Sequence, residues 1–288
     1  MAPSDPLFPV APLLASELAD AEALVAAAGW NQTIDDWQAF LTQGRVHAVR
    51  DDGRVIATAA ALPYGTRFGW ISMVLVNKDY QRRGIARDLL RRCIDDLSGA
   101  GLVAVLDATP AGREVYRNLG FQDSWGFQRL AAQHVKRGST NVPVGLSIRP
   151  IDDAIWPKLC AYDAATFGAD RTGLLSNLRK RIPQAALAAE RDGVITGFLL
   201  GRDGRVATQL GPLIAEDDET ARALLARALG AISGQVFIDV ADAKEDARAF
   251  LMAHGFASQR PLTRMLLGRN ERFDDPRRTC AVVGPEFG

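Results

Sequence analysis

Apolar and polar residues alternate along the first half of the chain with two periods, one typical of helices and one typical of strands. The pattern predicts helices over residues 16–28, 34–41, 83–97 and 112–119, and strands over residues 46–50, 54–62, 70–76 and 103–107. Asp52-Gly53 separates the first two strands and predicts a hairpin turn. The third helix has one apolar face, formed by Leu89, Leu90, Cys93, Ile94 and Leu97. Strands that alternate with helices predict an α/β (α+β) domain.

The second half of the chain repeats this plan. RDDGRVIATAAAL at 50–62 is echoed by ERDGVITGFLLG at 190–201, ARDLLRRCI at 86–94 by ARALLARAL at 221–229, and VYRNLGF at 115–121 by FLMAHGF at 250–256. Leu224 follows Leu89 by 135 residues, and Gly255 follows Gly120 by the same 135 residues. The shared offset indicates an internal duplication.

The duplication predicts two domains with a short join. Residues 136–150 are rich in Gly, Ser, Asn and Pro, which are typical of a linker. We therefore expect an N-terminal domain over residues 1–138, a second domain over 146–268, and a C-terminal tail over 269–288 that has no counterpart in the first copy. The apolar run Ala281-Val282-Val283 predicts that part of this tail packs back on the body.

Charge and cysteine content exclude several classes of function. Thirty-four basic residues balance thirty-four acidic ones, so net charge recruits neither nucleic acid nor an anionic membrane, and any anion site must be local. The three cysteines are far apart and fit neither a disulfide framework nor a metal site, and they indicate a reducing cytoplasm. With no signal peptide and no apolar run of about 18 residues, we expect a soluble, cytoplasmic protein with no membrane partner.

A glycine interrupts the start of the third predicted helix. The segment VNKDYQRRGIA, residues 76–86, leaves a buried strand and places Gly84 where it costs the helix about 1 kcal/mol relative to alanine. Successive amides at a helix N-terminus form a cradle for an anion, and a Cβ at position 84 would obstruct the approach of that anion. The segment therefore predicts a phosphate-binding turn.

This turn resembles the acetyl-CoA signature Q/R-x-x-G-x-G/A of the GNAT N-acetyltransferase superfamily. Its residues here are Gln81, Arg82, Arg83, Gly84, Ile85 and Ala86. The segment YRNLGF at 116–121 resembles the Y-x-x-x-G-F of the same family. The resemblance implies two tandem GNAT folds, each with a mixed, mostly antiparallel central sheet flanked by helices, and acetyl-CoA as cofactor.

The resemblance also assigns roles within the first copy. The acetyl group and pantetheine arm would lie along the strand that carries Met73, Val74 and Val76. Residues 81–86 would hold the pyrophosphate, and Tyr116 takes the position of the general acid. Thr109 stands where many members carry a pantetheine-binding asparagine, so this contact departs from the family pattern.

The second copy lacks the corresponding features. Residues 216–221 read EDDETA in place of QRRGIA, Leu251 replaces Tyr116, and the loop that enters the helix is about four residues shorter. An acidic turn would repel a pyrophosphate. We expect a degenerate C-terminal domain that serves support, substrate shaping or subunit contact.

The run AGWNQT at 28–33, followed by Asp36-Trp37, resembles bacterial tandem-GNAT proteins with a degenerate C-terminal domain, and in the superfamily this region helps to form the acceptor pocket. The predicted acceptor-side residues are Trp30, Asn31, Gln32, Asp35, Asp36 and Trp70. Asp35 and Asp36 are the acidic candidates for assisting the amine, and the competing interpretation is that one caps a helix and both are solvated. Tryptophans 30, 37, 70 and 125 form an aromatic pocket for a cation or fill the core.

The sequence thus predicts an acetyl-CoA-dependent N-acetyltransferase that transfers an acetyl group directly to a primary amine in a ternary complex. A small-molecule amine is the expected substrate, and no nucleic acid is expected as partner. The alternatives are acetylation of a protein amine and a CoA-responsive binding module without turnover. The chain is expected to be a monomer or a homodimer.

Overall fold

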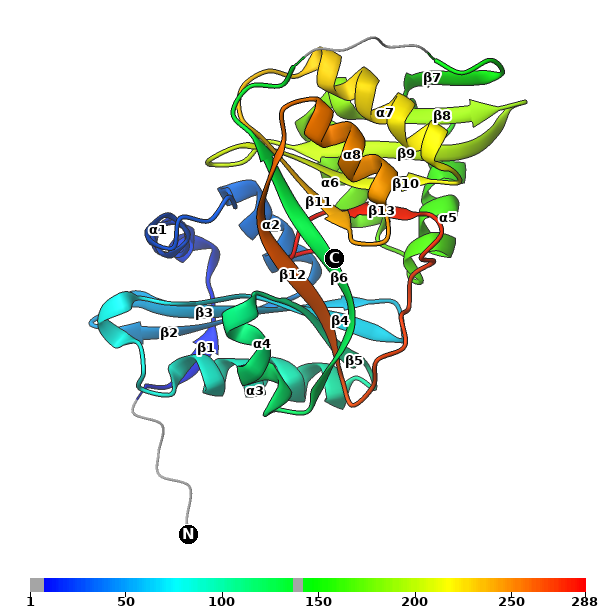
Figure 1. Cartoon of the computed structure of the whole chain (residues 1–288). Helices are drawn as coiled ribbons and strands as arrows, with labels where there is room; N and C mark the ends of the chain where they lie inside the picture. The colour runs from blue at the N-terminus through cyan, green and yellow to red at the C-terminus, as the bar shows by residue number, and fades with distance from the viewer. Residues whose placement is uncertain (1–7, 137–141) are drawn as a thin grey trace. The chain divides into compact units, whose positions relative to one another are not determined.

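Strands and helices alternate along the chain as the hydrophobic pattern predicts (Figure 1). The computed structural model describes residues 8–136 and 142–288, and the described chain divides between Ala104 and Val105 into two compact units. The first unit contains β1 (Val10–Pro12), η1 (Ala15–Glu17), α1 (Leu18–Ala27), α2 (Ile34–Gln43), β2 (Arg45–Asp51), β3 (Arg54–Tyr64), β4 (Phe68–Val76), η2 (Lys78–Tyr80), α3 (Ile85–Gly99) and the start of β5 (Val103–Ala108).

In the first unit, strands β1 to β4 pair antiparallel in chain order. Asp52 and Gly53, with φ of 46° and 77°, form the turn between β2 and β3, which confirms the predicted hairpin. Helix α3 buries the predicted apolar face: Leu89, Leu90, Cys93 and Leu97 are buried and Ile94 is partly buried.

The second unit contains the rest of the elements. They are α4 (Pro110–Arg117), β6 (Phe121–Ala132), β7 (Leu146–Pro150), α5 (Trp156–Phe167), α6 (Thr172–Arg181), η3 (Pro183–Ala185), β8 (Leu187–Arg191), β9 (Val194–Arg202), β10 (Thr208–Ala215), α7 (Asp218–Ala231), β11 (Val236–Ala241), α8 (Glu245–Ala253), β12 (Ala257–Leu267) and β13 (Thr279–Val282). The strand order is β5-β12-β6-β11-β13-β10-β9-β8-β7. Among these strands the pairings are antiparallel except that of β10 with β11, so the predicted mixed, mostly antiparallel sheet is confirmed.

The two sequence repeats exchange strands inside the second unit. Strand β12 of the second repeat lies between β5 and β6 of the first, and β6 also pairs with β11 of the second repeat. Arg129 and Arg264, which are 135 residues apart, each form a buried bidentate ion pair across this exchange, with Asp239 and Asp107 respectively. The spacing of the two arginines equals the offset of the sequence repeat, and their contacts match. The exchanged strands of the two repeats are therefore related by a local pseudo-twofold symmetry.

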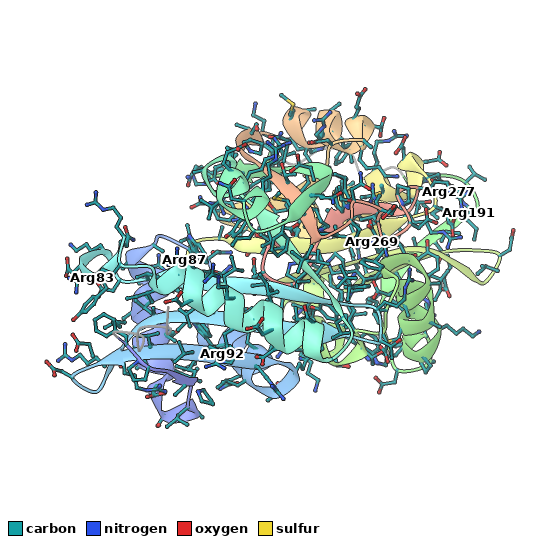
Figure 2. The ribbon with its side chains drawn as sticks, turned by 90° about the horizontal axis from the view of Figure 1, so that it is seen from below. Arg83, Arg87, Arg92, Arg191, Arg269 and Arg277 are labelled. Carbon is teal, nitrogen blue, oxygen red and sulfur yellow. The ribbon has the colours of Figure 1, made fainter. Side chains whose placement is uncertain are left out.

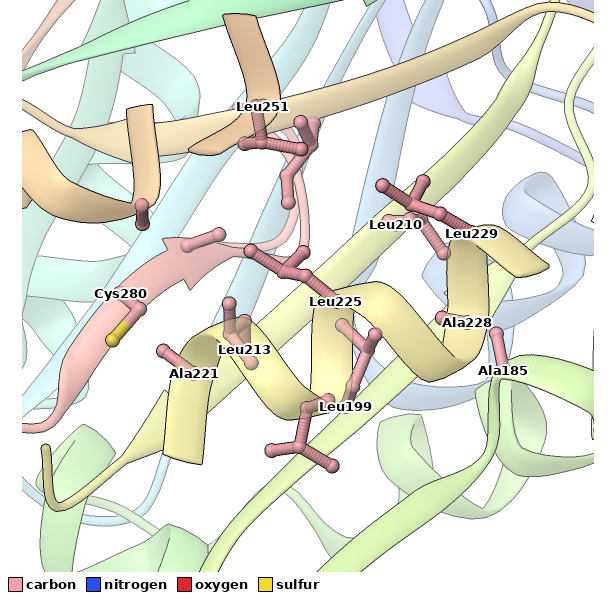
Figure 3. Packing of buried hydrophobic residues seen from close by; sticks show 14 of the residues in the cluster. Ala185, Leu199, Leu210, Leu213, Ala221, Leu225, Ala228, Leu229, Leu251 and Cys280 are labelled. Carbon is pink, nitrogen blue, oxygen red and sulfur yellow. The ribbon is translucent and has the colours of Figure 1, made fainter. Parts of the chain in front are cut away.

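The core of the second unit lies between α7 and the sheet (Figure 3). Ala221, Leu225 and Ala228 on one face of α7 pack with Leu199 of β9 and Leu213 of β10. Because side chains alternate along a strand, residue 198 points to the opposite face of the sheet, where Tyr162 of α5 meets Phe198 edge to face. The two faces of the sheet are thus covered by different helices.

The structure shifts the predicted start of one helix. Helix α4 begins at Pro110, two residues before the predicted start, because Thr109 caps it and a proline fits the first helical position. The compact-unit boundary falls inside the first repeat, since the exchanged strands tie the end of that repeat to the second. Residues 137–141 of the predicted join lie outside the described residues, and β7 starts at Leu146.

The tail prediction is confirmed, since Ala281, Val282 and Val283 are buried and β13 joins the sheet. Within the described ranges, no helix has the length and apolarity needed to cross a membrane.

Candidate functional site

The predicted phosphate turn connects β4 to α3 in the first unit. The side chain of Asn77 accepts a hydrogen bond from the amide of Asp79 at 3.1 Å, which starts the short helix η2. The Tyr80 hydroxyl donates to the Asp51 carboxylate at 2.5 Å, and this bond ties the turn to the β2–β3 hairpin. The turn is therefore held in place by side chains that sequence inspection did not single out.

The backbone of the turn leaves the first helical amides of α3 without a side-chain cap. Arg82 and Gly84 both have positive φ, at 62° and 86°, and Gly84 is the N-cap of α3. A glycine cap has no side chain, so it cannot accept from the amides of the first helical turn. A Cβ at position 84 would meet only the Arg87 guanidinium, at 3.6 Å, so the positive φ rather than crowding within the protein favours glycine.

The charge around this helix start is basic. Arg82, Arg83 and Arg87 are exposed there, and Figure 2 shows Arg83 and Arg87 at this end of α3. The Arg83 guanidinium donates to the Asp79 carbonyl at 3.0 Å and lies 5.0 Å from the centroid of the Tyr80 ring. Together with the positive end of the α3 dipole, these groups make this helix start a candidate anion site in a chain without net charge.

A β-bulge interrupts the strand that leads into the turn. Thr58 pairs with Leu75 and Ala60 with Ser72, so Met73 and Val74 face a single residue of β3. Met73 has a φ of 52°, and its carbonyl accepts from the Thr58 hydroxyl at 2.9 Å. A bulge leaves one residue out of the strand ladder, so backbone polar groups become available to a ligand. Met73 is buried, and Val74 and Val76 are partly buried.

Thr109 and Tyr116 belong to the second unit, on α4. The Thr109 hydroxyl accepts from the Gly112 amide at 3.3 Å, so this side chain serves as the cap of α4. Gly112 leaves room for the Tyr116 ring, because a Cβ there would lie 3.0 Å from it. The ring meets Phe121 edge to face, with centroids 6.1 Å apart.

The Tyr116 hydroxyl has chemical properties that fit a proton donor. Burial raises the pKa of this phenol above 10.0, its usual value, so the group stays protonated at neutral pH. Within the described part of the chain, no hydrogen-bond partner of the hydroxyl is recorded, which leaves its proton available to a ligand.

An ion cluster fixes α4 to β6. Arg113 and Arg117, one turn apart on α4, both donate to the Asp123 carboxylate on β6, with Arg113 at 2.9 and 2.5 Å. The hydrogen bond from Arg113, together with that from Arg117, lowers the pKa of Asp123 to about 2. This clamp on the helix that carries Tyr116 was not predicted, although arginines at i and i+4 are a signal that sequence inspection could have used.

The acceptor-side residues occupy the start of α2 and strand β4. Asn31, Gln32 and Asp36 are buried, while Trp30 and Asp35 are partly buried. Asp36 accepts from the Thr33 amide at 2.9 Å and forms a capping box, which confirms the capping interpretation for this aspartate, although Asp36 is buried and not solvated as that interpretation expected.

Within the same region of the first unit, the Gln32 side-chain oxygen is buried without a hydrogen-bond partner among the described residues. An unpaired buried acceptor is costly, so it is a candidate contact for a ligand.

The aromatic side chains mostly fill the core. Trp37 and Trp70 are 0% and 2% exposed and pack edge to face on Phe40 and Tyr64. The Trp125 ring contacts the guanidinium groups of two arginines of its own unit, at 4.2 and 4.5 Å, so protein cations already occupy it. These contacts favour the core interpretation over an aromatic pocket for all but the partly buried Trp30. The His47 ring nitrogen Nε2 lies 2.6 Å from the Asp96 carboxylate, a contact that fits a structural role for this histidine.

The second repeat replaces the open cap by a carboxylate. Asp217 is the N-cap of α7, and its side chain accepts from the Thr220 amide at 2.7 Å. Glu219 forms an ion pair with Arg191 at 2.7 Å, and Leu251 is fully buried in the core. An acidic group of the chain therefore fills the place that the first repeat leaves open to an anion.

Comparison with known proteins agrees with the division of the sequence into two repeats. A model of the "Acetyltransferase (GNAT) family" matches residues 15–121, and a model described as "Acetyltransferase (GNAT) domain" matches residues 159–279. The chain is 26% identical over 236 residues to the uncharacterized N-acetyltransferase YitH of Bacillus subtilis, covering 81% of this chain and 82% of that protein.

Solved structures share the fold over nearly the whole chain. A provisionally assigned acetyltransferase from Pyrococcus horikoshii superimposes with a TM-score of 0.76 at 19% identity, over 98% of this chain and 96% of that one. A tandem GNAT protein from the clavulanic acid biosynthesis pathway gives a TM-score of 0.63 at 16% identity, over 90% of this chain and 98% of that one. At these identities the likeness concerns the fold alone.

The chain belongs to the GNAT acetyltransferase family and carries two GNAT domains in tandem. It is an acyltransferase, and members of this family generally use acetyl-CoA as the acetyl donor.

Proposed function

We propose that the first repeat binds acetyl-CoA and transfers its acetyl group directly to a primary amine of a small molecule. The observation that carries the proposal is the difference between the two helix starts. Gly84 leaves the first turn of α3 open amid basic side chains, whereas Asp217 closes the first turn of α7 with its own carboxylate. A single anionic donor site per chain follows from this difference.

The residues of the first unit fit the donor. The amides of residues 82–86 would hold the pyrophosphate, with Arg82 and Arg83 as counter-charges. The bulge at Met73 and Val74, together with Val76, would hold the acyl end through backbone groups that the strand ladder does not use. Acetyl-CoA supplies an acetyl group activated as a thioester.

Tyr116 would donate a hydrogen bond to the departing sulfur. Its pKa lies above 10.0, while a thiol has a pKa of about 8.5, so full proton transfer costs at least about 2 kcal/mol. Stabilisation of the thiolate by a charge-assisted hydrogen bond is therefore the larger part of its contribution. The clamp of Arg113 and Arg117 on Asp123 would keep the helix of Tyr116 in place.

The acceptor amine must lose its proton before it attacks. An alkylamine with a pKa of about 10.4 pays between about 4 and 5 kcal/mol for the neutral form at pH 7. We propose that Trp30, Asn31, Gln32 and Asp35 line the acceptor side, whereas Asp36 serves as the cap of α2 and Trp70 packs in the core. The unpaired oxygen of Gln32 would accept from the amine, and a desolvated pocket would favour the neutral form.

The test is thiol release from acetyl-CoA in the presence of a panel of small amines and of peptides with free amines. We expect release that depends on a small amine, with intersecting initial-velocity lines, as a ternary complex requires. Parallel lines would contradict direct transfer. Turnover with peptides alone would favour protein acetylation, and acetyl-CoA binding without turnover on any amine would favour the binding module.

A further inference from the structure

The tail contributes a strand to the middle of the second repeat. Strands β10 and β11 pair in parallel only over residues 208–210 and 236–238. Beyond this point β13 lies between them, pairing Ala281 with Leu213 on one side and with Val240 on the other. Figure 1 shows β13, in red, beside β10 and β11. Among the described residues the first repeat supplies no equivalent strand, because the chain continues from β6 toward the second repeat.

Strand β10, which borders the gap filled by β13, corresponds to β4, the strand of the first repeat that would line the donor. In the β9–β10 pair, Leu199 faces Leu213 and Gly201 faces Leu210, so Gly211 and Pro212 form a bulge opposite one residue. The β3–β4 pair has the same bulge at Met73 and Val74, and the first bulge residue has positive φ in both repeats. Strand β4 leads into α3, where the anion cradle is proposed, and β10 leads into α7, which has lost it.

The tail backbone lies directly on the bulge of the second repeat. A Cβ added to Gly211 would come within 2.0 Å of the Val282 carbonyl oxygen. The Ala215 amide donates to the Arg278 carbonyl at 3.0 Å. The peptide chain of the tail therefore follows β10 at van der Waals and hydrogen-bonding distance.

Buried side chains hold the tail on both sides of the bulge. Glu286 forms a buried ion pair with Arg202 of β9, and Arg171 donates to the Gly288 carbonyl at 3.0 Å. Phe287 is 0% exposed, and Cys280 of β13 packs in the core with α7 (Figure 3). These contacts are more extensive than those of a surface strand.

We propose that the C-terminal tail permanently occupies a groove of the second repeat. This groove is the counterpart of the one that would bind the acetyl-CoA arm in the first repeat. The identity of this groove rests on the proposed function of the first repeat. A pantetheine arm carries two amide groups, so a peptide backbone offers the same kind of donors and acceptors to the bulged strand. A tethered segment acts at an effective concentration on the order of millimolar, and a free donor competes poorly with it. The second repeat thus excludes the donor by the tail as well as by the Asp217 cap.

The thiol of Cys280 reports on the tail in the full chain. It is buried, so a thiol reagent such as DTNB labels it only when β13 leaves the groove. We expect Gly211→Ala, which places a methyl against the Val282 carbonyl, to label Cys280 at least tenfold faster than the wild type. The control is Gly234→Ala, which also places an alanine at a positive φ, of 82° against 140° at Gly211, but leaves open space around the new Cβ, and it should label no faster.

Peptide mass mapping separates Cys280 from Cys160, the half-buried thiol of α5 that reports on general unfolding of the same unit. If Gly211→Ala does not fold, Val283→Ala provides a milder release, with an expected severalfold increase at Cys280 and none at Cys160. An equal rate of Cys280 labelling in the wild type, Gly211→Ala and Val283→Ala would overturn the proposal.

A second arm adds saturating acetyl-CoA to the wild type. We expect the rate of Cys280 labelling to stay unchanged, because the donor does not enter this groove. An increase would mean that the tail is displaced and that the second repeat also binds the donor, which would overturn permanent occupancy. The Gly211→Ala comparison needs no bound donor, so a failure of the proposed function is distinguishable from a failure of this proposal.

Discussion

Tyr116→Phe separates a role in chemistry from a role in packing. The substitution keeps the ring that meets Phe121 at 6.1 Å and removes a hydroxyl for which no partner is recorded within the described chain. We therefore expect the free energy of unfolding to change by less than about 0.5 kcal/mol, because the substitution breaks no hydrogen bond among the described residues and keeps the ring contact. The affinity for acetyl-CoA should also change little, because the cradle is on another element.

Turnover should fall, because the hydroxyl would stabilise a developing thiolate. A hydrogen bond to a charged group contributes about 1.5–3 kcal/mol, which corresponds to a decrease in kcat of roughly 10- to 150-fold. The pKa of Tyr116 is raised above 10.0 by burial, so the phenol is protonated at every pH below that value. The wild type should accordingly show no loss of activity from ionisation of this group below pH 10.0.

The assay is initial-rate thiol release, with chemical denaturation and acetyl-CoA binding measured on the same preparations. Tyr162→Phe is the matched control, because its hydroxyl donates to the Thr196 carbonyl at 3.2 Å in the second repeat. The control should lose about 1 kcal/mol of stability and no turnover. Unchanged kcat in Tyr116→Phe, or a loss of stability as large as that of the control, would refute the proton-donor assignment.

Three single variants and one double variant test the supporting structure. Asp123→Asn should lower the free energy of unfolding by about 1 kcal/mol at pH 7, after allowance for the partial exposure of this side chain. The pKa of Asp123 is depressed from 3.8 to about 2 in the folded state. Urea unfolding of the wild type should therefore show the loss of this stabilisation as the pH falls from about 4 to 2. Arg129→Met should cost about 3–5 kcal/mol by leaving the Asp239 charge buried without its cation, with the hydrogen bond from Gln209 remaining, and the added Asp239→Leu should recover most of that loss in thermal unfolding. Asp217→Ala should cost about 1 kcal/mol through the lost cap without creating a second donor site by calorimetry, since β13 remains in place.

Local sequence signals predicted most helices and strands and the position of the turn before α3. The Asp52-Gly53 hairpin follows from two residues that tolerate positive φ, and the α3 core face follows from apolar spacing alone. The turn at Gly84 was predicted because a glycine is costly inside a helix. The φ of 86° at this position explains why a glycine stands there. Each of these features depends on neighbours in sequence, which a single sequence displays.

Long-range pairings could not be predicted in the same way. The exchange of β6 and β12 joins residues more than a hundred positions apart, such as Arg129 and Asp239. The place of β13 depends on a gap between two other strands, and the apolar Ala281 to Val283 run shows only that the tail is buried. Trp37 and Trp70 illustrate the same difficulty, because composition does not distinguish a pocket wall from the core.

The central claim is that one repeat of the two binds the donor. Calorimetric titration with acetyl-CoA on the wild type and on Gly84→Glu tests it most directly, since the variant places a carboxylate at the open cap and forces a side chain into a φ of 86°. We predict one site per chain in the wild type and none in the variant. Two sites per chain, or a variant that binds as tightly as the wild type, would contradict the account.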